Sequence, residues 1–152
     1  MPETPSYPFA DLALSRRLER TEAQSNIDFV EARARAFPQS RAGHLEVAGA
    51  HAMFDGADSP LTQSFCLGIE QAVTKTDLDL IESFFRDFGA PVFHEVSPLA
   101  DPTALALLNE TGYEPFEFTS VMFQPTVAGR FADSPKPGRL RARAIGAAEN
   151  EA

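Results

Sequence analysis

The chain has 152 residues, which is enough for one ordinary domain with a core and short for two. Its apolar fraction of 43% is typical of a globular protein, and no apolar run approaches the roughly 18 residues of a membrane-spanning helix. The single cysteine, Cys66, excludes an internal disulfide and a thiolate-rich metal site, and we expect it to be a buried bystander. The start lacks the basic-then-apolar order of an export signal, so we expect a cytoplasmic, bacterial-type protein.

The charge is unevenly distributed along the chain. The net charge is −9, and residues 130–143 contribute +4 with five cations against one acidic residue, so the remainder carries −13. A body this acidic repels a phosphate backbone, which argues against nucleic-acid binding. The same negative potential favours small cationic ligands such as amines.

Residues 9–37 predict one long helix or two in succession. Apolar residues recur there with the spacing of a buried helical stripe: Ala23, Ile27, Val30, Ala34 and Phe37. The Arg and Glu residues between them form the solvated face, and Pro38 ends the helix.

Two extended segments follow this helix. Residues 44–54 predict the first, with Gly49 marking a bulge or a close approach, and residues 55–60 supply turn chemistry. Residues 61–70 predict the second, because larger apolar residues alternate with smaller ones along it. We expect the two segments to form an antiparallel pair.

The clearest helix signal lies in residues 74–91. Thr76 can cap its start, Gly89 suits a left-handed end position, and Pro91 prevents continuation. One face of this helix is apolar, with Leu78, Ile81, Phe85 and Phe88.

Residues 100–113 predict another capped helix. Asp101 is its cap, Pro102 lies in its first turn, and Gly112 terminates it. Its inward residues are expected to be Leu105 and Leu108.

Short strands are predicted on either side of that helix, at residues 92–97 and 114–125. Alternating strands and helices after an antiparallel start indicate an α/β (α+β) protein with a mixed sheet flanked by helices. Residues 126–138 have the Pro, Gly and Ala content of a linker. Residues 139–152 open with a strand-like run that either adds to a sheet edge or begins a further domain.

Three strings carry a family resemblance: FVEARARAFP at 29–38, VAGAHAMFDGADSPLTQ at 47–63, and FHEVSPLADPTALALLNETGYEPFEFTSVMF at 93–123. With the order of elements, they resemble the first half of a bacterial subgroup of GNAT acetyltransferases that carries two such domains in tandem. The resemblance covers about residues 10–125 and implies a mostly antiparallel central sheet flanked by helices. It makes residues 1–125 a GNAT-like domain and residues 139–152 the first strand of a truncated second one.

The resemblance places an acetyl-CoA loop just before the second predicted helix. A competent GNAT loop reads Arg or Gln, two residues, Gly, one residue, then Gly or Ala, so that backbone amides reach the pyrophosphate. Here Gln71 fits, but Thr74 and Thr76 replace both small residues and block the close backbone approach. Asp77 and Asp79 add negative charge in the first turn of the helix. We therefore expect this half to bind no acetyl-CoA.

The catalytic acid implied by the resemblance has no counterpart. GNAT domains often place a Tyr four residues before the glycine of a Gly-Phe or Gly-Tyr pair, to reprotonate the departing thiolate. The matching pair is Gly112 and Tyr113, and the residue at that spacing is Leu108. Leu108 belongs to the apolar stripe of its helix, which indicates core packing.

His94 and Glu95 are the weak catalytic candidates. Adjacent strand residues point to opposite faces, so the two cannot converge on one ligand without a bulge. Glu95 could act as a general base for an amine, but a structural polar residue is the commoner outcome. His44 and His51 lie seven residues apart on one extended segment and share no face, so no metal site is predicted.

Three functional hypotheses follow. The leading one is the non-catalytic N-terminal half of a tandem GNAT N-acetyltransferase, in which acetyl-CoA and the chemistry of acetyl transfer to an amine belong to the full-length protein. The alternative is a free-standing degenerate GNAT-like module that binds a partner protein or a small cationic ligand. In the third, the chain acetylates alone through Gln71 and strand amides. The expected partners are a C-terminal GNAT domain or a second protomer and a small amine acceptor, with no nucleic acid and no membrane.

Overall fold

The computed structural model describes residues 9–123, of which residues 9–115 belong to one compact unit and residues 116–123 belong to a second unit. The predicted linker at 126–138 and the predicted strand at 139–152 lie outside the described residues. The described elements, in chain order, are α1 (Leu12–Ala36), a 3-10 turn (Pro38–Ser40), β1 (Gly43–Val47), β2 (Ala50–Phe54), β3 (Gln63–Phe65), α2 (Lys75–Asp87) and α3 (Pro102–Glu110). The predicted α+β class is confirmed.

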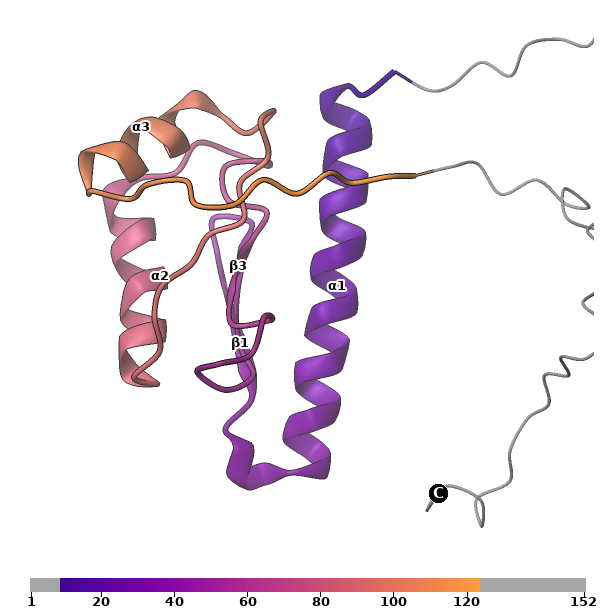
Figure 1. Ribbon diagram of the computed structural model, residues 1–152, viewed down its shortest axis with the longest axis vertical. Coiled ribbons are helices and arrows are strands. Elements are labelled where there is room, and N and C mark those ends of the chain that lie inside the picture. Colours follow the sequence, from indigo (N-terminus) through magenta and orange to yellow (C-terminus); the bar gives the residue numbers. More distant parts are fainter. Residues whose placement is uncertain (1–8, 124–152) are drawn as a thin grey trace, which may run out of the picture. The chain divides into compact units, whose positions relative to one another are not determined.

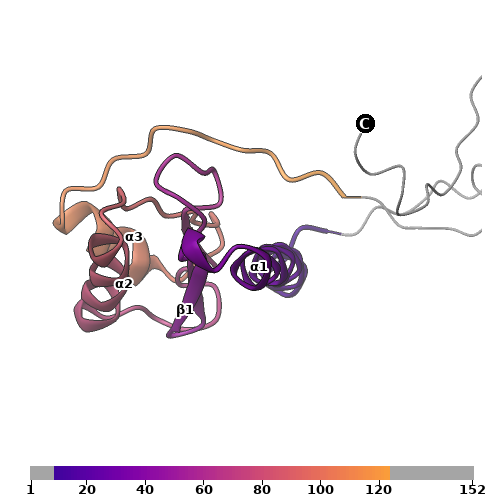
Figure 2. The ribbon, with the colours of Figure 1, turned by 90° about the horizontal axis from the view of Figure 1, so that it is seen from below.

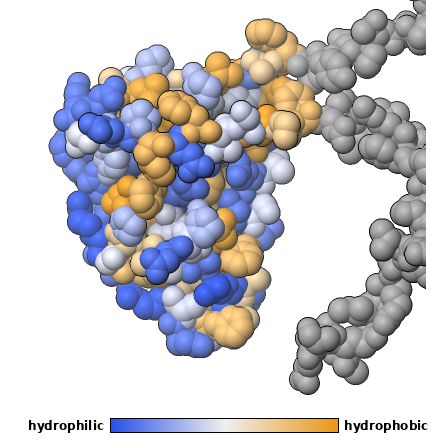
Figure 3. Space-filling view, viewed as in Figure 1, coloured by the Kyte–Doolittle hydropathy of each residue, from blue (hydrophilic) through white to orange (hydrophobic). Residues whose placement is uncertain are grey.

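The first unit has three layers. The three strands form an antiparallel sheet in the order β1-β2-β3, with α1 on one face and α2 and α3 on the other (Figures 1 and 2). Each face of the sheet holds its own buried apolar cluster. On the face of the molecule drawn in Figure 3, exposed apolar groups lie among hydrophilic residues, and several of them adjoin one another at the upper right.

The first predicted helix is a single helix, α1. Its start is capped by Asp11, whose side chain accepts a hydrogen bond of 2.8 Å from the Leu14 amide. The predicted stripe is buried at Ala23, Ile27 and Val30. The prediction is wrong at Phe37, which is 55% exposed. The helix ends at Ala36, and the φ of −135° at Phe37 lies outside the helical range, so its side chain does not continue the buried stripe.

The prediction of a single extended segment at 44–54 is wrong, because these residues form the hairpin β1–β2. Ala48 and Gly49 both have positive φ, 52° and 77°, as a two-residue type I′ turn requires. Gly49 therefore marks a chain reversal and not a bulge. The predicted close approach is confirmed, since a Cβ on Gly49 would lie 3.0 Å from the Cβ of Glu70. The predicted antiparallel pairing with the next segment is confirmed between β2 and β3.

The strand predicted at 61–70 is shorter in the structure and contains only Gln63–Phe65. Cys66 follows with a left-handed φ of 63°, which ends the ladder. Residues 65–69 are all buried, so the alternation in size does not separate a buried face from an exposed one. Instead, Leu67 packs toward α2 and α3, whereas Cys66 and Ile69 pack toward α1.

The α2 and α3 helices form close to the predicted positions. The α2 residues Leu78, Ile81 and Phe85 are buried. In α3 the predicted Asp101 cap is confirmed, since its side chain accepts a hydrogen bond from the Thr103 amide. The inward residues of α3 include Leu108 and Ala104, which lies one turn before it, whereas the predicted Leu105 is 48% exposed.

The strand predicted at 92–97 is reduced to one parallel bridge between His94 and Ser64 of β3. Pro91 and Pro98 lack the backbone donors that a longer ladder needs. The strand predicted at 114–125 is absent over residues 114–123, where the described backbone belongs to no strand of the sheet.

Candidate functional site

The N-terminus of α2 is where the resemblance implies an acetyl-CoA loop. The cap is Thr74, not the predicted Thr76. Thr74 Oγ1 accepts from the Asp77 amide at 3.2 Å, and the Asp77 carboxylate accepts from the Thr74 amide at 2.9 Å. Thr74 holds the cap because its backbone is extended, as an N-cap requires, while Thr76 already lies inside the helix. This reciprocal capping box satisfies amides that an anion would otherwise use.

The charges around this helix start also disfavour an anion. The hydroxyl of Thr74 donates to Asp77 at 2.6 Å, and together with the backbone bond it lowers the pKa of Asp77, so this carboxylate stays ionised. Lys75, the nearest cation in the sequence, is held by Asp79 at 2.7 Å. Gln71 is exposed. A pyrophosphate placed at this helix start would meet the fixed carboxylate of Asp77.

The connection from β3 to α2 is filled by the chain's own groups. Arg16 of α1 donates to the Ile69 carbonyl at 2.9 Å, and Arg20 pairs with the Glu70 carboxylate at 2.6 Å. On the other face, the Asp101 amide donates to the Gly68 carbonyl at 2.7 Å. A Cβ on Gly68 would lie 2.7 Å from the Cβ of Ala104, so α3 leaves no space for even a methyl group there.

His94 is tied to the sheet and is not presented to a ligand. Its Nδ1 lies 2.7 Å from the Ser64 hydroxyl, and Ser64 is fully buried. Nε2 is also buried and has no hydrogen-bond partner among the described residues. Burial lowers the pKa of His94 to about 4, so the imidazole is neutral at pH 7 and a weak base. The Ser64 hydroxyl is therefore held inside the sheet beside the imidazole.

Tyr113 extends the same network to α2. Its ring meets the imidazole of His94 edge-on, with 4.8 Å between the ring centroids, and its hydroxyl donates to Glu82 at 3.1 Å. Burial, and then the charge of Glu82, raise the pKa of Tyr113 above its ordinary value, which makes it a poorer proton donor. Glu82 is also paired with Arg86 at 3.1 Å. The network joins the sheet, α2 and the chain after α3.

The remaining candidates also show no reactive arrangement. Glu95 is half-buried, and its amide donates to the Ser64 carbonyl at 2.8 Å. Cys66 is buried as predicted, and burial raises the pKa of its thiol to about 12, which removes nucleophilic thiolate at neutral pH. Glu19 lies near Ser97 and Ser15, and burial, as the largest cause, raises the pKa of its carboxyl.

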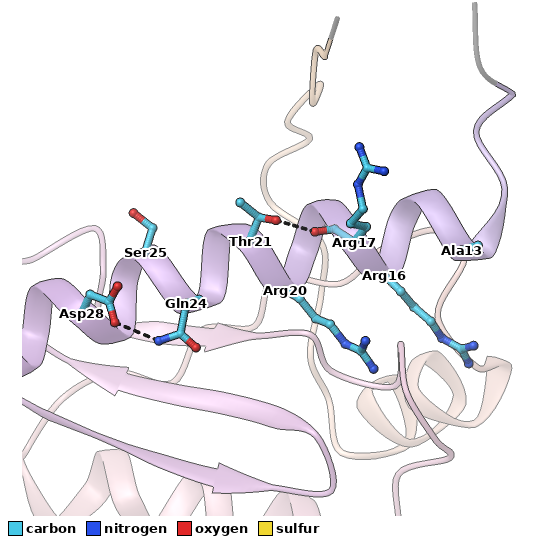
Figure 4. A pocket seen from close by; sticks show the side chains of 8 residues that line it. All are labelled: Ala13, Arg16, Arg17, Arg20, Thr21, Gln24, Ser25 and Asp28. Carbon is cyan, nitrogen blue, oxygen red and sulfur yellow. Dashed lines mark hydrogen bonds between the residues drawn. The ribbon is translucent and has the colours of Figure 1, made fainter. Parts of the chain in front are cut away.

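A shallow hollow runs along α1, and the described residues that line it all belong to that helix (Figure 4): Ala13, Arg16, Arg17, Arg20, Thr21, Gln24, Ser25 and Asp28. Figure 4 shows Arg16 and Arg20 on one side of the helix and Arg17 on the other. Gln24 and Asp28 bond to each other at 2.8 Å. The carboxylate that lines the hollow is therefore engaged by a neighbour on the same helix.

The prediction that His44 and His51 share no face is wrong, because it assumed that residues 44–54 form one extended segment. The hairpin places Glu46 opposite His51, and His44 is two residues from Glu46, so all three lie on one face of the sheet. Within the described residues, no group of three or more His, Cys, Asp or Glu side chains is arranged to hold a metal ion. Among the same residues, no helix is long and apolar enough to cross a bilayer.

In comparisons with known proteins, no family model, no curated protein and no solved structure matches this chain.

Sequence reasoning missed the network of Ser64, His94, Tyr113 and Glu82. Residues 64 and 94 are thirty positions apart, and no local pattern joins them. The spacing of Glu82 and Arg86 does signal an i,i+4 ion pair on a helix, but it does not reveal the tyrosine that binds the same carboxylate.

Proposed function

We propose that this chain is a GNAT-like module that binds no acetyl-CoA itself, and that it forms the N-terminal half of a cytoplasmic tandem N-acetyltransferase. In the full-length protein, the acetyl group would pass from acetyl-CoA to an amine. The order of α1, the β1–β2 hairpin, β3, α2, the bridged segment at 94 and α3 supports the proposal, because it follows the order that the resemblance implies up to α3. The final strand of that order is absent over residues 114–123. The parallel direction of the Ser64–His94 bridge fits a helical crossover through α2.

The observation that carries the proposal is the capping box at α2. A competent acyl-CoA loop needs free backbone amides at a helix start, with room for a diphosphate. Here Asp77 occupies that position and is held by two hydrogen bonds from Thr74. A pyrophosphate would have to displace a carboxylate, and the Thr74 side chain would still stand in its path.

A docking role is supported by the second unit. Residues 116–123 contain large apolar side chains that are strongly exposed: Phe116 at 76%, Phe118 at 90% and Met122 at 92%. Exposed apolar groups gathered in one short segment favour a protein partner. The same observation favours the alternative, a free-standing degenerate module that binds a partner protein.

Calorimetric titration of the 152-residue chain with acetyl-CoA tests the non-catalytic assignment. We expect no heat of binding up to about 1 mM ligand, because the helix start is already occupied. A mixture of adenosine and pantetheine, which together lack the pyrophosphate, is the matched control for binding through those parts alone. Micromolar binding of acetyl-CoA would overturn the proposal and favour autonomous acetylation.

Reading the coding sequence beyond Ala152 separates the two remaining hypotheses. The tandem hypothesis expects an in-frame domain with an Arg/Gln-x-x-Gly-x-Gly loop. A stop codon at that position, together with a stable complex with another protein, would favour the free-standing module.

A further inference from the structure

β1 lies at an edge of the sheet, and within the described residues it pairs only with β2. Figure 2 shows it at the margin of the layer. Its side chains alternate, with His44 and Glu46 exposed and Gly43, Leu45 and Val47 half-buried. An edge strand presents a row of backbone N–H and C=O groups that can pair with another strand.

The hairpin decides which backbone groups of β1 face outward. Val47 and Ala50 flank a two-residue turn and form a hydrogen-bonded pair, and such pairs alternate along an antiparallel ladder. The backbone of Leu45 therefore bonds to β2, whereas the N–H and C=O groups of His44 and Glu46 point away from the sheet. Across the described residues, these groups join no backbone hydrogen bond outside the ladder.

This edge is complementary to itself about Leu45. If a second copy of β1 runs antiparallel with Leu45 opposite its own counterpart, His44 lies opposite Glu46 of the partner subunit. By symmetry, Glu46 lies opposite His44 of the partner subunit. Both are outward-facing residues, so each pair can exchange two N–H···O bonds in a regular ladder.

The side chains favour the same register. An imidazole N–H can donate to the carboxylate directly opposite it, and opposite charges facing each other across strands are stabilising. His51 already lies opposite Glu46 within the chain, so the carboxylate would sit between two imidazoles in one row. On the other face, Leu45 packs beside the buried cluster, and its counterpart would extend that apolar surface.

We propose that β1 pairs with β1 of a second copy of this chain, joining the two sheets into one continuous antiparallel sheet about a two-fold axis at Leu45. The contact is small, since each strand contributes five residues, whereas a standard stable interface buries about 1,600 Å². The dimer is therefore weak and forms at high protein concentration. This proposal is independent of acyl transfer.

A charge-exchange experiment tests the register. His44→Glu places two carboxylates opposite each other, and Glu46→His places two imidazoles opposite each other. Each variant alone should weaken the dimer about tenfold in sedimentation equilibrium, because each change acts at two symmetric pairs. An equimolar mixture of the two variants should restore dimer formation, since both pairs become Glu opposite His. The matched control is Glu110→His, an exposed residue of α3, which should leave the dimer unchanged.

A backbone variant gives a second measurement. Glu46→Pro removes an outward N–H while keeping the bonds of Leu45 to β2, so it should abolish the dimer while the circular dichroism spectrum is retained. A chain that sediments as a monomer up to about 1 mM overturns the proposal. So does a dimer that His44→Glu leaves unchanged, or a mixture that associates no better than its components.

Discussion

The two faces of the sheet hold their helices in different ways. α1 is 25 residues long and buries only Ala23, Ile27 and Val30. α2 buries the same number of residues in 13, including Phe85, and shares its cluster with α3. α1 instead adds polar anchors along its length, with Arg16 at the Ile69 carbonyl, Arg20 at Glu70 and Arg33 at Asp55.

This difference shows that a long helix with a narrow apolar stripe can be positioned by charged contacts at its two halves. Apolar burial is not directional, so it fixes α2 and α3 through shape and volume. Ion pairs and hydrogen bonds have defined geometry, so they fix where α1 lies along the sheet. Substitutions on each face should therefore differ in size and in cause.

The largest effect is expected on the α2/α3 face. Phe85→Ala removes a fully buried ring and should lower the free energy of unfolding by about 3–5 kcal/mol, measured by urea denaturation. The matched control is Leu80→Ala on the exposed side of the same helix, which should change it by less than about 0.5 kcal/mol. Equal effects from the two variants would contradict the assigned packing.

Low pH should lower the stability of the α2/α3 face through protonation of His94. Its pKa falls from 6.5 to about 4 on folding, so the unfolded chain binds a proton first as the pH drops. Stability is complete above about pH 6.5 and is lost as the pH falls toward 4, by up to about 3 kcal/mol.

Urea midpoints from pH 7 to 4 for the protein and for His94→Gln measure this loss. The variant lacks the imidazole, so the stability difference between the two proteins should shrink with acid. A pH-independent difference would mean that His94 titrates alike in the folded and unfolded chains.

A smaller effect is expected on the α1 face at Arg33, whose Nε lies 2.9 Å from the carboxylate of the buried Asp55. Arg33→Ala leaves that carboxylate with the Ser59 hydroxyl as its remaining described partner, and should cost about 1–3 kcal/mol. Arg35→Ala is the control, because its i,i+4 pair with Glu31 is exposed and should be worth less than about 0.5 kcal/mol. If Arg35→Ala lowers the stability in thermal unfolding by more than Arg33→Ala does, polar anchoring of α1 is refuted.

The smallest effect concerns the start of α2. Thr74→Ala removes the side-chain cap and should cost about 1 kcal/mol, measured by thermal unfolding. Thr76→Ala should cost almost nothing, because Thr76 is exposed inside the first turn. A larger loss of stability for Thr76→Ala than for Thr74→Ala would support Thr76 as the cap, as the sequence predicted.

The sequence predicted the three helices well, because their caps and stripes are local. Pro38 ends α1, Asp101 caps α3, and the apolar residues of α2 recur at helical spacing. It failed at 44–54, where strand-forming residues run on both sides of Ala48 and Gly49 and the reversal depends on two positive φ angles. It also failed at Leu105, because the buried face of a short apolar helix is set by what it packs against.

The sequence by itself determined the α+β class, the helix positions and the absence of a glycine-rich loop before α2, since these depend on residue type and short-range spacing. The Thr74-x-x-Asp77 capping box that closes that helix start is also local, since its two residues lie three positions apart. Only the tertiary structure decided that Ser64 meets His94 and that His44, Glu46 and His51 share one face of the sheet. Such contacts join residues through chain reversals and a crossover, and their pairing is set by global packing that no local pattern encodes.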